Sequence, residues 1–136
     1  MNVPLVSCDT SVLVAALLPA HEAHERCRAA VRRVNAVPSQ VLLETYRVLT
    51  SLPGRDRVPA QQAAEALGAL QWRVLQPQLE DTIVLIAKLA RAGRGGGAVY
   101  DAHIAASCAA NGATLVTRDR RAAPSYALFD VAYELV

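Results

Sequence analysis

The sequence is poor in aromatic residues and in cysteine. Aromatic side chains make up 4% of its 136 residues, so a surface that stacks on several bases is not expected. The three cysteines, Cys8, Cys27 and Cys108, form no CxxC pair. Their odd number argues against a disulfide framework, and their spacing argues against a thiolate zinc site. We therefore expect all three to be small residues of the hydrophobic core.

Long apolar runs are also missing. No run approaches the roughly 18 residues that a membrane span requires, and the first residues lack the basic region and cleavage site of a secretory signal. These absences favour a cytoplasmic protein with no membrane segment. The hydrophobic content of 53% is enough for a core in a chain of this length, so we expect a single domain over residues 1–136.

Lysine is nearly absent, because Lys88 is the only lysine among the 14 basic residues. Arginine is well suited to bidentate contacts with phosphate groups, which would fit a nucleic-acid partner. An arginine-rich genome composition would produce the same count. Composition alone leaves both explanations open.

Helical and strand patterns alternate along the chain. "PLVSC" and "TLVT" are apolar without alternation, which is typical of strands buried on both faces of a parallel sheet. We expect a three-layer α/β/α sandwich with a central, mainly parallel twisted sheet. Thr10 or Ser11 is the expected N-cap of the first helix, and Ser39 that of the third. The expected strands are 4–8, 35–38, 72–77 and 113–119, with further strand in 126–136, and the expected helices are 11–18, 20–33, 39–52, 60–71, 80–93 and 98–112.

Acidic residues stand at the ends of these elements. Asp9 and Asp119 each follow an apolar strand, and sites in open parallel sheets lie outside the carboxyl ends of the strands. Asp101 lies near the start of a helix that returns to the sheet, which brings it to the same edge. Glu44 lies on a mainly apolar helix. The sequence thus predicts that four carboxylates converge.

Each acid also has an ordinary structural explanation. Asp9 could cap a helix, Asp101 could complement a helix dipole, Asp119 could form a turn, and Glu44 could pair with an arginine. Four converging carboxylates would repel one another, however, at a cost of roughly several kcal/mol for each close pair. Divalent cations relieve such repulsion, and oxygen ligands favour Mg²⁺ or Mn²⁺. The remaining surface would then be cationic, which suits a polyanionic substrate.

Four segments resemble a known family. "DTSVL" at Asp9, "QVLLETYRVLT" at Glu44, "YDAHIAA" at Asp101 and "LVTRDRR" at Asp119 are similar to the PIN-domain nucleases, and among them to the VapC-like toxins of bacterial type II toxin-antitoxin pairs. The resemblance covers essentially the whole chain. It implies a PIN-like fold and a Mg²⁺- or Mn²⁺-dependent endoribonuclease with these four acids as catalytic, metal-binding residues. A metal-activated water would attack phosphorus in line, leaving a 5′ phosphate and a 3′ hydroxyl.

The resemblance also implies partners: a homodimer and a small cognate antitoxin that blocks the site. Thr10, Ser11 and Thr117 are candidates for hydrogen bonds that orient the acids. Arginines near the expected site are candidates for contacts with RNA phosphates. These are Arg94, Arg118, Arg120 and Arg121.

Other patterns point elsewhere and are less well supported. "HEAHE" places its histidines three apart, whereas the HExxH zinc motif needs four, and "GRGGGA" follows a helix where a dinucleotide-binding motif needs a strand. Trp72 and Tyr100 could stack on bases, but Trp72 fits a core position better. A phosphatase-like or receiver-type site lacks the second acid of a DxD motif after Asp9. A catalytically weak PIN-like domain that binds RNA or a partner remains the alternative function.

Overall fold

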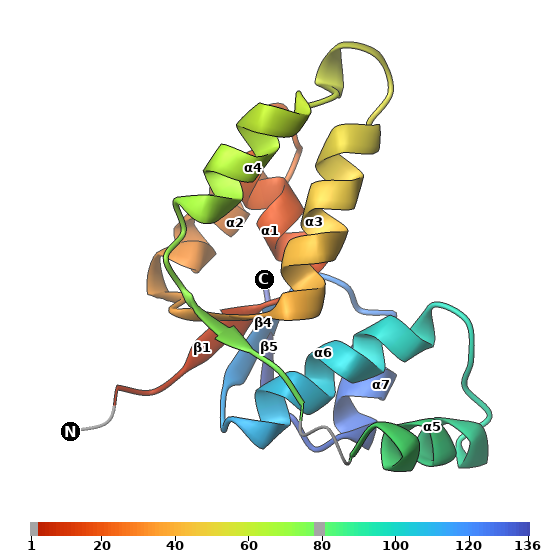
Figure 1. Ribbon diagram of the computed structural model, residues 1–136. Coiled ribbons are helices and arrows are strands. Elements are labelled where there is room, and N and C mark those ends of the chain that lie inside the picture. The colour runs from red at the N-terminus through yellow and green to blue at the C-terminus, as the bar shows by residue number, and fades with distance from the viewer. Residues whose placement is uncertain (1–2, 78–80) are drawn as a thin grey trace.

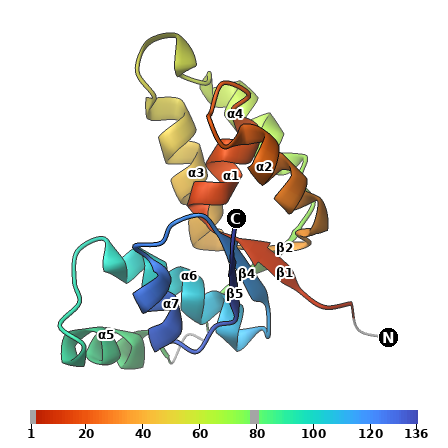
Figure 2. The same ribbon diagram turned by 180° about the vertical axis from the view of Figure 1, so that it is seen from behind.

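The chain folds as a central parallel sheet with helices on both faces (Figure 1). A computed structural model describes residues 3–77 and 81–136. Its elements are β1 (Val6–Cys8), α1 (Thr10–Leu17), α2 (His24–Ala30), the 3-10 helix η1 (Val31–Arg33), β2 (Ala36–Pro38), α3 (Ser39–Ser51), the 3-10 helix η2 (Gly54–Asp56), α4 (Ala60–Gly68), β3 (Arg73–Leu75), α5 (Thr82–Arg91), α6 (Ala98–Ala110), β4 (Thr114–Thr117), α7 (Ala123–Leu128) and β5 (Tyr133–Leu135). The first four α-helices lie on one side of the sheet and the last three on the other (Figures 1 and 2). The expected three-layer α/β/α architecture is confirmed.

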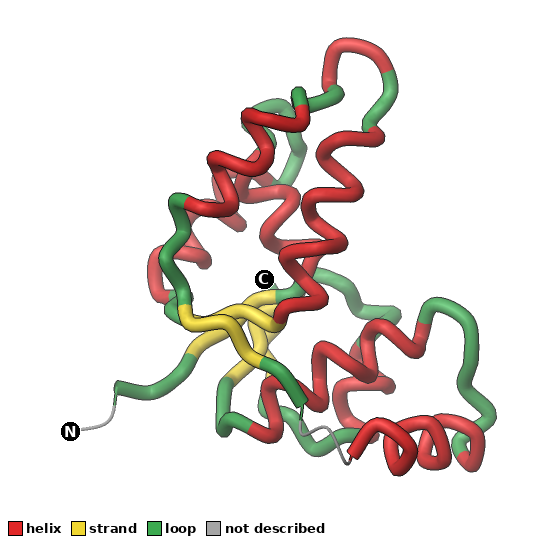
Figure 3. Tube along the Cα trace, viewed as in Figure 1, coloured by secondary structure: helices red, strands yellow, loops and turns green. Residues whose placement is uncertain are grey.

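The strands are short (Figure 3). The pairings β1–β4, β4–β5 and β2–β3 are parallel. β4 lies between β1 and β5, and β2 pairs with β3. Asn35 connects the two groups, because its backbone N–H donates to the Val6 carbonyl at 2.9 Å and its side-chain oxygen accepts from the Val6 N–H at 2.8 Å. Parallel pairing brings the carboxyl ends of β1 and β4 to the same edge of the sheet.

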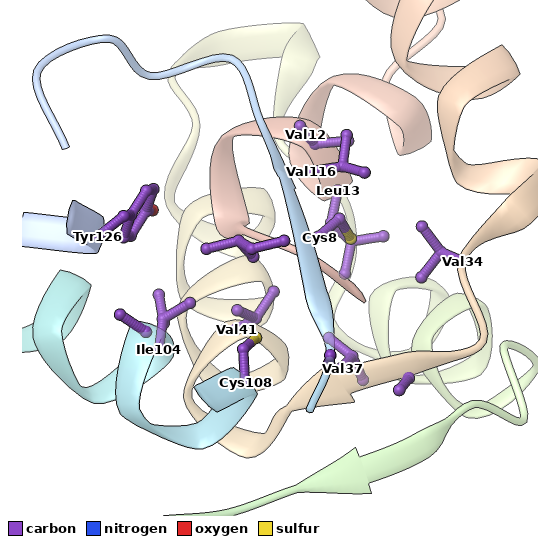
Figure 4. Packing of buried hydrophobic residues seen from close by; sticks show 14 of the residues in the cluster. Cys8, Val12, Leu13, Val34, Val37, Val41, Ile104, Cys108, Val116 and Tyr126 are labelled. Atoms are coloured by element: carbon purple, nitrogen blue, oxygen red, sulfur yellow. The ribbon is translucent and has the colours of Figure 1, made fainter. Parts of the chain in front are cut away.

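Small and branched apolar side chains fill the space between sheet and helices (Figure 4). Leu13 of α1, Val41 of α3 and Ile104 of α6 are buried against strand residues such as Val116. Full burial of such a side chain contributes about 1.5–3 kcal/mol. The three cysteines are free and buried in or beside this core, as expected from the sequence. Trp72 is partly buried against the same core.

Two expected helix caps are wrong. The N-cap of α1 is Asp9, not Thr10 or Ser11, and its carboxylate accepts a hydrogen bond from the Val12 N–H. Thr10 already lies in the first turn, so its hydroxyl cannot serve as the cap. Ser39 is likewise the first residue of α3 itself, preceded by Pro38, and no side chain caps that helix.

The extents of two other segments also differ from expectation. The helix predicted over 20–33 is shorter, because α2 begins at His24 and the chain tightens into η1 at Val31. Tyr126 belongs to α7 and not to a strand, and only β5 provides the expected terminal strand. Pro124 lies in the first turn of α7, where its missing N–H costs nothing. The expected helix start at Glu80 lies outside the described residues.

Within residues 3–77 and 81–136, no helix is both long enough and apolar enough to cross a membrane.

Candidate functional site

Four carboxylates line one small cavity at the carboxyl edge of the sheet. The cavity measures about 130 Å³ and is called here the acidic cavity. Asp9 reaches it from the end of β1 and Asp119 from just beyond β4, while Asp101 enters from the first turn of α6 and Glu44 from the middle of α3. The other lining residues are Thr10, Ser11, Ile104 and Tyr126.

Asp9 is the most deeply buried of the four acids, with 3% of its surface exposed. One carboxylate oxygen accepts hydrogen bonds from the Ser11 hydroxyl at 2.5 Å and the Val12 N–H at 3.2 Å. The other accepts from the Thr117 hydroxyl and from the Tyr126 hydroxyl at 2.8 Å. Burial raises the pKa of Asp9, and these four donors oppose the rise because they stabilise the ionised form. The side chain is thereby held in one orientation.

Ser11 and Thr117 also connect the β1 edge to the segment after β4. The Thr117 hydroxyl oxygen accepts a hydrogen bond from the Asp119 N–H at 3.0 Å. The Ser11 hydroxyl oxygen accepts from the Arg118 N–H at 3.4 Å. Each hydroxyl therefore donates to Asp9 and accepts from the segment that carries Asp119. The Thr10 hydroxyl differs: it is buried and has no hydrogen-bond partner among the described residues.

Asp101 and Glu44 experience the negative charge of the site. Burial, followed by the charges of Asp119, Asp9 and Glu44, raises the pKa of Asp101 to about 6. Burial also raises the pKa of Glu44, although a hydrogen bond from Gln40 at 3.2 Å and the charge of Arg47 oppose the rise. In the part of the chain that the structure describes, no ion pair with lysine, arginine or histidine involves Asp9, Glu44 or Asp101. Asp119 is the acid of this cavity that forms an ion pair among the described residues, 3.9 Å from the Arg121 guanidinium. The negative charge of the cavity is therefore only partly balanced.

The donor chemistry of the acidic cavity fits a hard divalent cation. All its acidic donors are carboxylate oxygens, and Mg²⁺ is usually held by one or two carboxylates together with several waters. The side chains do not form a compact cage: across residues 3–77 and 81–136, no group of three or more histidine, cysteine, aspartate or glutamate side chains is arranged to hold an ion. The fit to such an ion therefore rests on the type of donor and not on a compact group of ligands.

Arginines surround a second cavity beside the first. This arginine cavity measures about 400 Å³ and shares Ser11 and Asp119 with the acidic cavity. The Arg121 N–H donates to Asp119 at 2.9 Å, and its guanidinium lies 3.9 Å from the same carboxylate. The Arg118 guanidinium lies 3.8 Å from Glu22. The residues that complete the lining are Arg118, Arg120 and Arg121.

Arg94 lies apart from these cavities. Its guanidinium donates to the Ser125 hydroxyl at 3.3 Å, which joins the loop before α6 to α7. It lines neither the acidic cavity nor the arginine cavity. Of the four arginines considered from the sequence, three therefore lie beside the acids and Arg94 does not.

Two of the three histidines make local contacts in the fold. His21 accepts a hydrogen bond from the Ala23 N–H at 3.0 Å, and a ring nitrogen of His24 lies 2.9 Å from the Ala15 carbonyl oxygen. His103 is half-buried, and burial lowers its pKa. None of the three lines the acidic cavity.

Tyr126 and Ile104 line the acidic cavity but were not expected there from the sequence. Tyr126 is the polar one of the two. Its buried hydroxyl contacts Asp9 from 117 positions away in the chain, and burial raises its pKa further above the ordinary tyrosine value. No local sequence motif points to Tyr126, and the pattern of residues 126–136 predicts a strand. A tyrosine close after "LVTRD" in a parallel α/β chain is the one available signal, because that segment must pass the carboxyl edge of the sheet.

Comparisons with known proteins agree with this architecture. Residues 6–126 match the model of the PIN domain family. Ribonuclease VapC40 of Mycobacterium tuberculosis is 36% identical over 143 residues, covering 97% of this chain and 99% of that protein. Ribonuclease VapC27 of the same organism is 38% identical over 124 residues, covering 90% of each. The crystal structure of DNA-bound VapBC from Salmonella typhimurium is similar with a TM-score of 0.65 and 22% identity, covering 97% of this chain and 98% of that chain.

Proposed function

This chain belongs to the PIN domain family, and on that premise we propose that it is a metal-dependent endoribonuclease toxin of the VapC type. The observation that carries the proposal is the convergence of four carboxylates on one cavity without a paired cation at Asp9, Glu44 or Asp101 among the described residues. Relatives that align along nearly the whole chain are named ribonucleases. We propose one domain over residues 1–136 and action in the cytoplasm.

In this proposal the four acids, Asp9, Glu44, Asp101 and Asp119, hold Mg²⁺, for which Mn²⁺ can substitute. When bound, such an ion lowers the pKa of a water and offsets charge on the phosphoryl group. Ser11, Thr117 and Tyr126 favour the ionised form of Asp9 and orient its carboxylate. Thr10 adds a hydroxyl at the wall of the cavity.

The RNA backbone is proposed to enter along the arginine cavity. Arg118, Arg120 and Arg121 place positive charge directly beside Asp119. Arginine is among the side chains that proteins use to contact a nucleic-acid backbone. The Arg94 guanidinium donates one hydrogen bond to Ser125, and its other N–H groups can donate to a further partner. Arg94 therefore stays a candidate for RNA contact. The neighbouring charges thus favour phosphate outside the acidic cavity and a cation within it.

The partners follow from the same premise. One protein of this fold has been solved as DNA-bound VapBC. We propose that this chain forms a homodimer and that a small cognate antitoxin neutralises it by covering the acidic cavity, in a complex larger than the dimer. A neighbouring reading frame that encodes a small DNA-binding protein would support this assignment.

Cleavage of RNA by the purified protein tests the proposal. Structured RNA is incubated with Mg²⁺, Mn²⁺ or EDTA, and 5′-phosphate products are sought on sequencing gels. We expect cleavage with either metal and its loss with EDTA, with Asp9→Asn and with Asp101→Asn. Glu25→Gln, at an exposed acid of α2, is the matched control and should cleave normally. Cleavage that survives chelation or both aspartate substitutions would overturn the metal-dependent mechanism.

A second candidate is a PIN-like domain that binds RNA or a partner with little catalysis. The absence of a compact three-ligand cluster within the described residues is the observation that favours it. It predicts RNA binding that does not depend on Asp101 and no cleavage under any metal condition. The same gels, combined with a binding measurement, distinguish the two functions.

A further inference from the structure

A groove beside the acidic cavity lies between α3 and the start of α6. It measures about 280 Å³ and is called here the α3–α6 groove. Its α3 residues are Gln40, Leu43, Glu44 and Arg47, whose spacing places them along one face of the helix. Tyr100, in the first turn of α6, lies on the opposite side. The two helices pack against each other and face the same edge of the sheet (Figure 1).

Glu44 lines both the acidic cavity and the α3–α6 groove. Tyr100 directly precedes Asp101, so its side chain leaves the same helical turn that supplies a carboxylate to the acidic cavity. A group bound in the groove would therefore lie next to any phosphate held at the acids. The groove is a neighbour of the proposed reaction centre and not a separate surface.

The lining of the groove combines flat apolar surface with hydrogen-bond donors. Tyr100 is 54% exposed and Leu43 is 69% exposed, although both are large hydrophobic side chains. Arg47 is exposed and takes part in no ion pair within the described chain. Gln40 uses one amide N–H on Glu44, which leaves the other available.

We propose that the α3–α6 groove binds one unpaired nucleobase of the RNA beside the bond that is cut, and this inference rests on the proposed function. The base stacks on the Tyr100 ring and contacts Leu43, while Arg47 and Gln40 donate hydrogen bonds to its edge or to the adjoining phosphate. Proteins recognise single-stranded RNA in this way, with splayed bases on aromatic rings. The volume is close to the roughly 300 Å³ at which small-ligand pockets begin.

The position of the groove, which shares Glu44 with the acidic cavity, favours a nucleotide over a second copy of this chain as the occupant. Leu43, Tyr46, Val99 and Tyr100 are all exposed and would suit a protein interface. The groove is concave, however, and it presents Arg47 beside a site that the proposed function fills with phosphate. A self-association interface at this position remains an outcome of the test.

Abasic scanning tests the inference. A single-stranded RNA that the protein cleaves is labelled, and its affinity is measured by fluorescence anisotropy in EDTA, which prevents cleavage. One abasic nucleotide is then moved through each position around the cut. We expect one position next to the cut at which loss of the base weakens binding by about 5- to 100-fold, as for a stacked base.

Tyr100 variants connect that position to the groove. Tyr100→Ala should weaken binding of intact RNA by the same factor and should abolish sensitivity to the abasic nucleotide at that position. Tyr100→Phe keeps the ring and should therefore restore the sensitivity to the abasic nucleotide that Tyr100→Ala loses. Tyr46→Ala is the matched control, because Tyr46 is 39% exposed on α3 but does not line the groove. Circular dichroism verifies that each variant is folded.

The remaining outcomes overturn the inference in distinguishable ways. If wild-type protein binds and cleaves RNA but no position depends on Tyr100, the groove does not hold a base and the proposed function stands. If wild-type protein neither binds nor cleaves RNA, the proposed function is wrong. The inference is then wrong as well, because it depends on that function. If Tyr100→Ala instead dissociates an oligomer in sedimentation velocity while base sensitivity persists, the groove belongs to an interface between copies.

Discussion

At the scale of single residues, Asp9 caps α1 and also accepts hydrogen bonds from Ser11, Thr117 and Tyr126 inside the acidic cavity. Helix capping and a place in the functional site are therefore compatible for this residue. The cap fixes the backbone at the end of β1, and the three hydroxyls fix the carboxylate. An aspartate supported in this way keeps its geometry when charge nearby changes.

Tyr126→Phe tests the support of Asp9. The substitution removes one donor from a buried carboxylate and keeps the ring, so we expect a loss of stability of about 1.5–3 kcal/mol, typical of hydrogen bonds to charged groups. Mg²⁺ affinity should also fall, by about 10- to 100-fold. Chemical denaturation and isothermal titration calorimetry measure the two effects. Tyr46→Phe, at an exposed tyrosine, is the control.

An unchanged Mg²⁺ affinity in Tyr126→Phe, together with a normal rate of cleavage, would show that the hydroxyl only stabilises the fold. A loss of Mg²⁺ affinity in the Tyr46→Phe control would show instead that the measurement responds to surface changes unrelated to Asp9.

At the scale of elements, the start of α6 contributes to two neighbouring features. Asp101 enters the acidic cavity, and the residue before it lines the α3–α6 groove. The first turn of a helix favours negative charge, because its N–H groups are unpaired. Burial and the other acids outweigh that effect here, since the pKa of Asp101 rises to about 6. The element therefore holds a carboxylate that takes up a proton more readily than it would in the unfolded chain.

This raised pKa predicts how the stability of the metal-free protein depends on pH. Between pH 3.8 and about 6 the folded protein retains a proton at Asp101 that the unfolded chain has released. Stability from this group is therefore fully present below pH 3.8 and is lost as the pH rises to about 6. Asp101 is half-buried, so solvent screening reduces the size of the effect.

Melting temperatures between pH 3.5 and 7.5 in EDTA measure this dependence. Asp101→Asn should remove the part of the decline that lies between pH 3.8 and 6, because the amide does not titrate. Asp56→Asn, at an exposed acid of η2, should leave the curve as in wild type. An identical decline in Asp101→Asn would assign it to other groups.

At the scale of the whole molecule, negative and positive side chains gather in two neighbouring cavities. The acidic cavity concentrates carboxylates at the sheet edge, and the arginine cavity lies beside it. The formal net charge of +2 conceals this separation. Each cavity alone would attract ions of one sign. Together they suit a phosphate diester approached by a cation, which is the arrangement that the proposed function requires.

Metal binding should stabilise the folded molecule as a whole. A ligand that binds only the folded state adds about 2.7 kcal/mol when its concentration is 100 times its dissociation constant. We therefore expect the melting temperature to rise with Mg²⁺ concentration in scanning calorimetry. Asp101→Asn should reduce the rise, and NaCl of equal ionic strength should not reproduce it. A melting temperature that is the same in both salts would contradict binding of Mg²⁺ at this site.

Several features could be predicted from the sequence because they depend on local rules. Apolar strands without alternation indicate a parallel sheet, and parallel strands bring Asp9 and Asp119 to one edge whatever the details of packing. Helix patterns located α3 and α6, and therefore Glu44 and Asp101. The errors lay where local signals compete. Asp9, Thr10 and Ser11 are all good capping residues. The helix α7 extends into residues 126–128, which were expected to be strand.

The sequence by itself determined the order of the main helices and strands up to β4 and the edge at which the acids stand, because chain direction and side-chain hydropathy suffice for both. Only the tertiary structure decided that Tyr126 donates to Asp9 and that Tyr100 faces Arg47 across a groove. The physical reason is the long separation of these residues along the chain, over which local sequence patterns carry no information. Both arrangements bring together residues far apart in the chain, and the packing of α6 and α7 against the sheet decides which side chains meet.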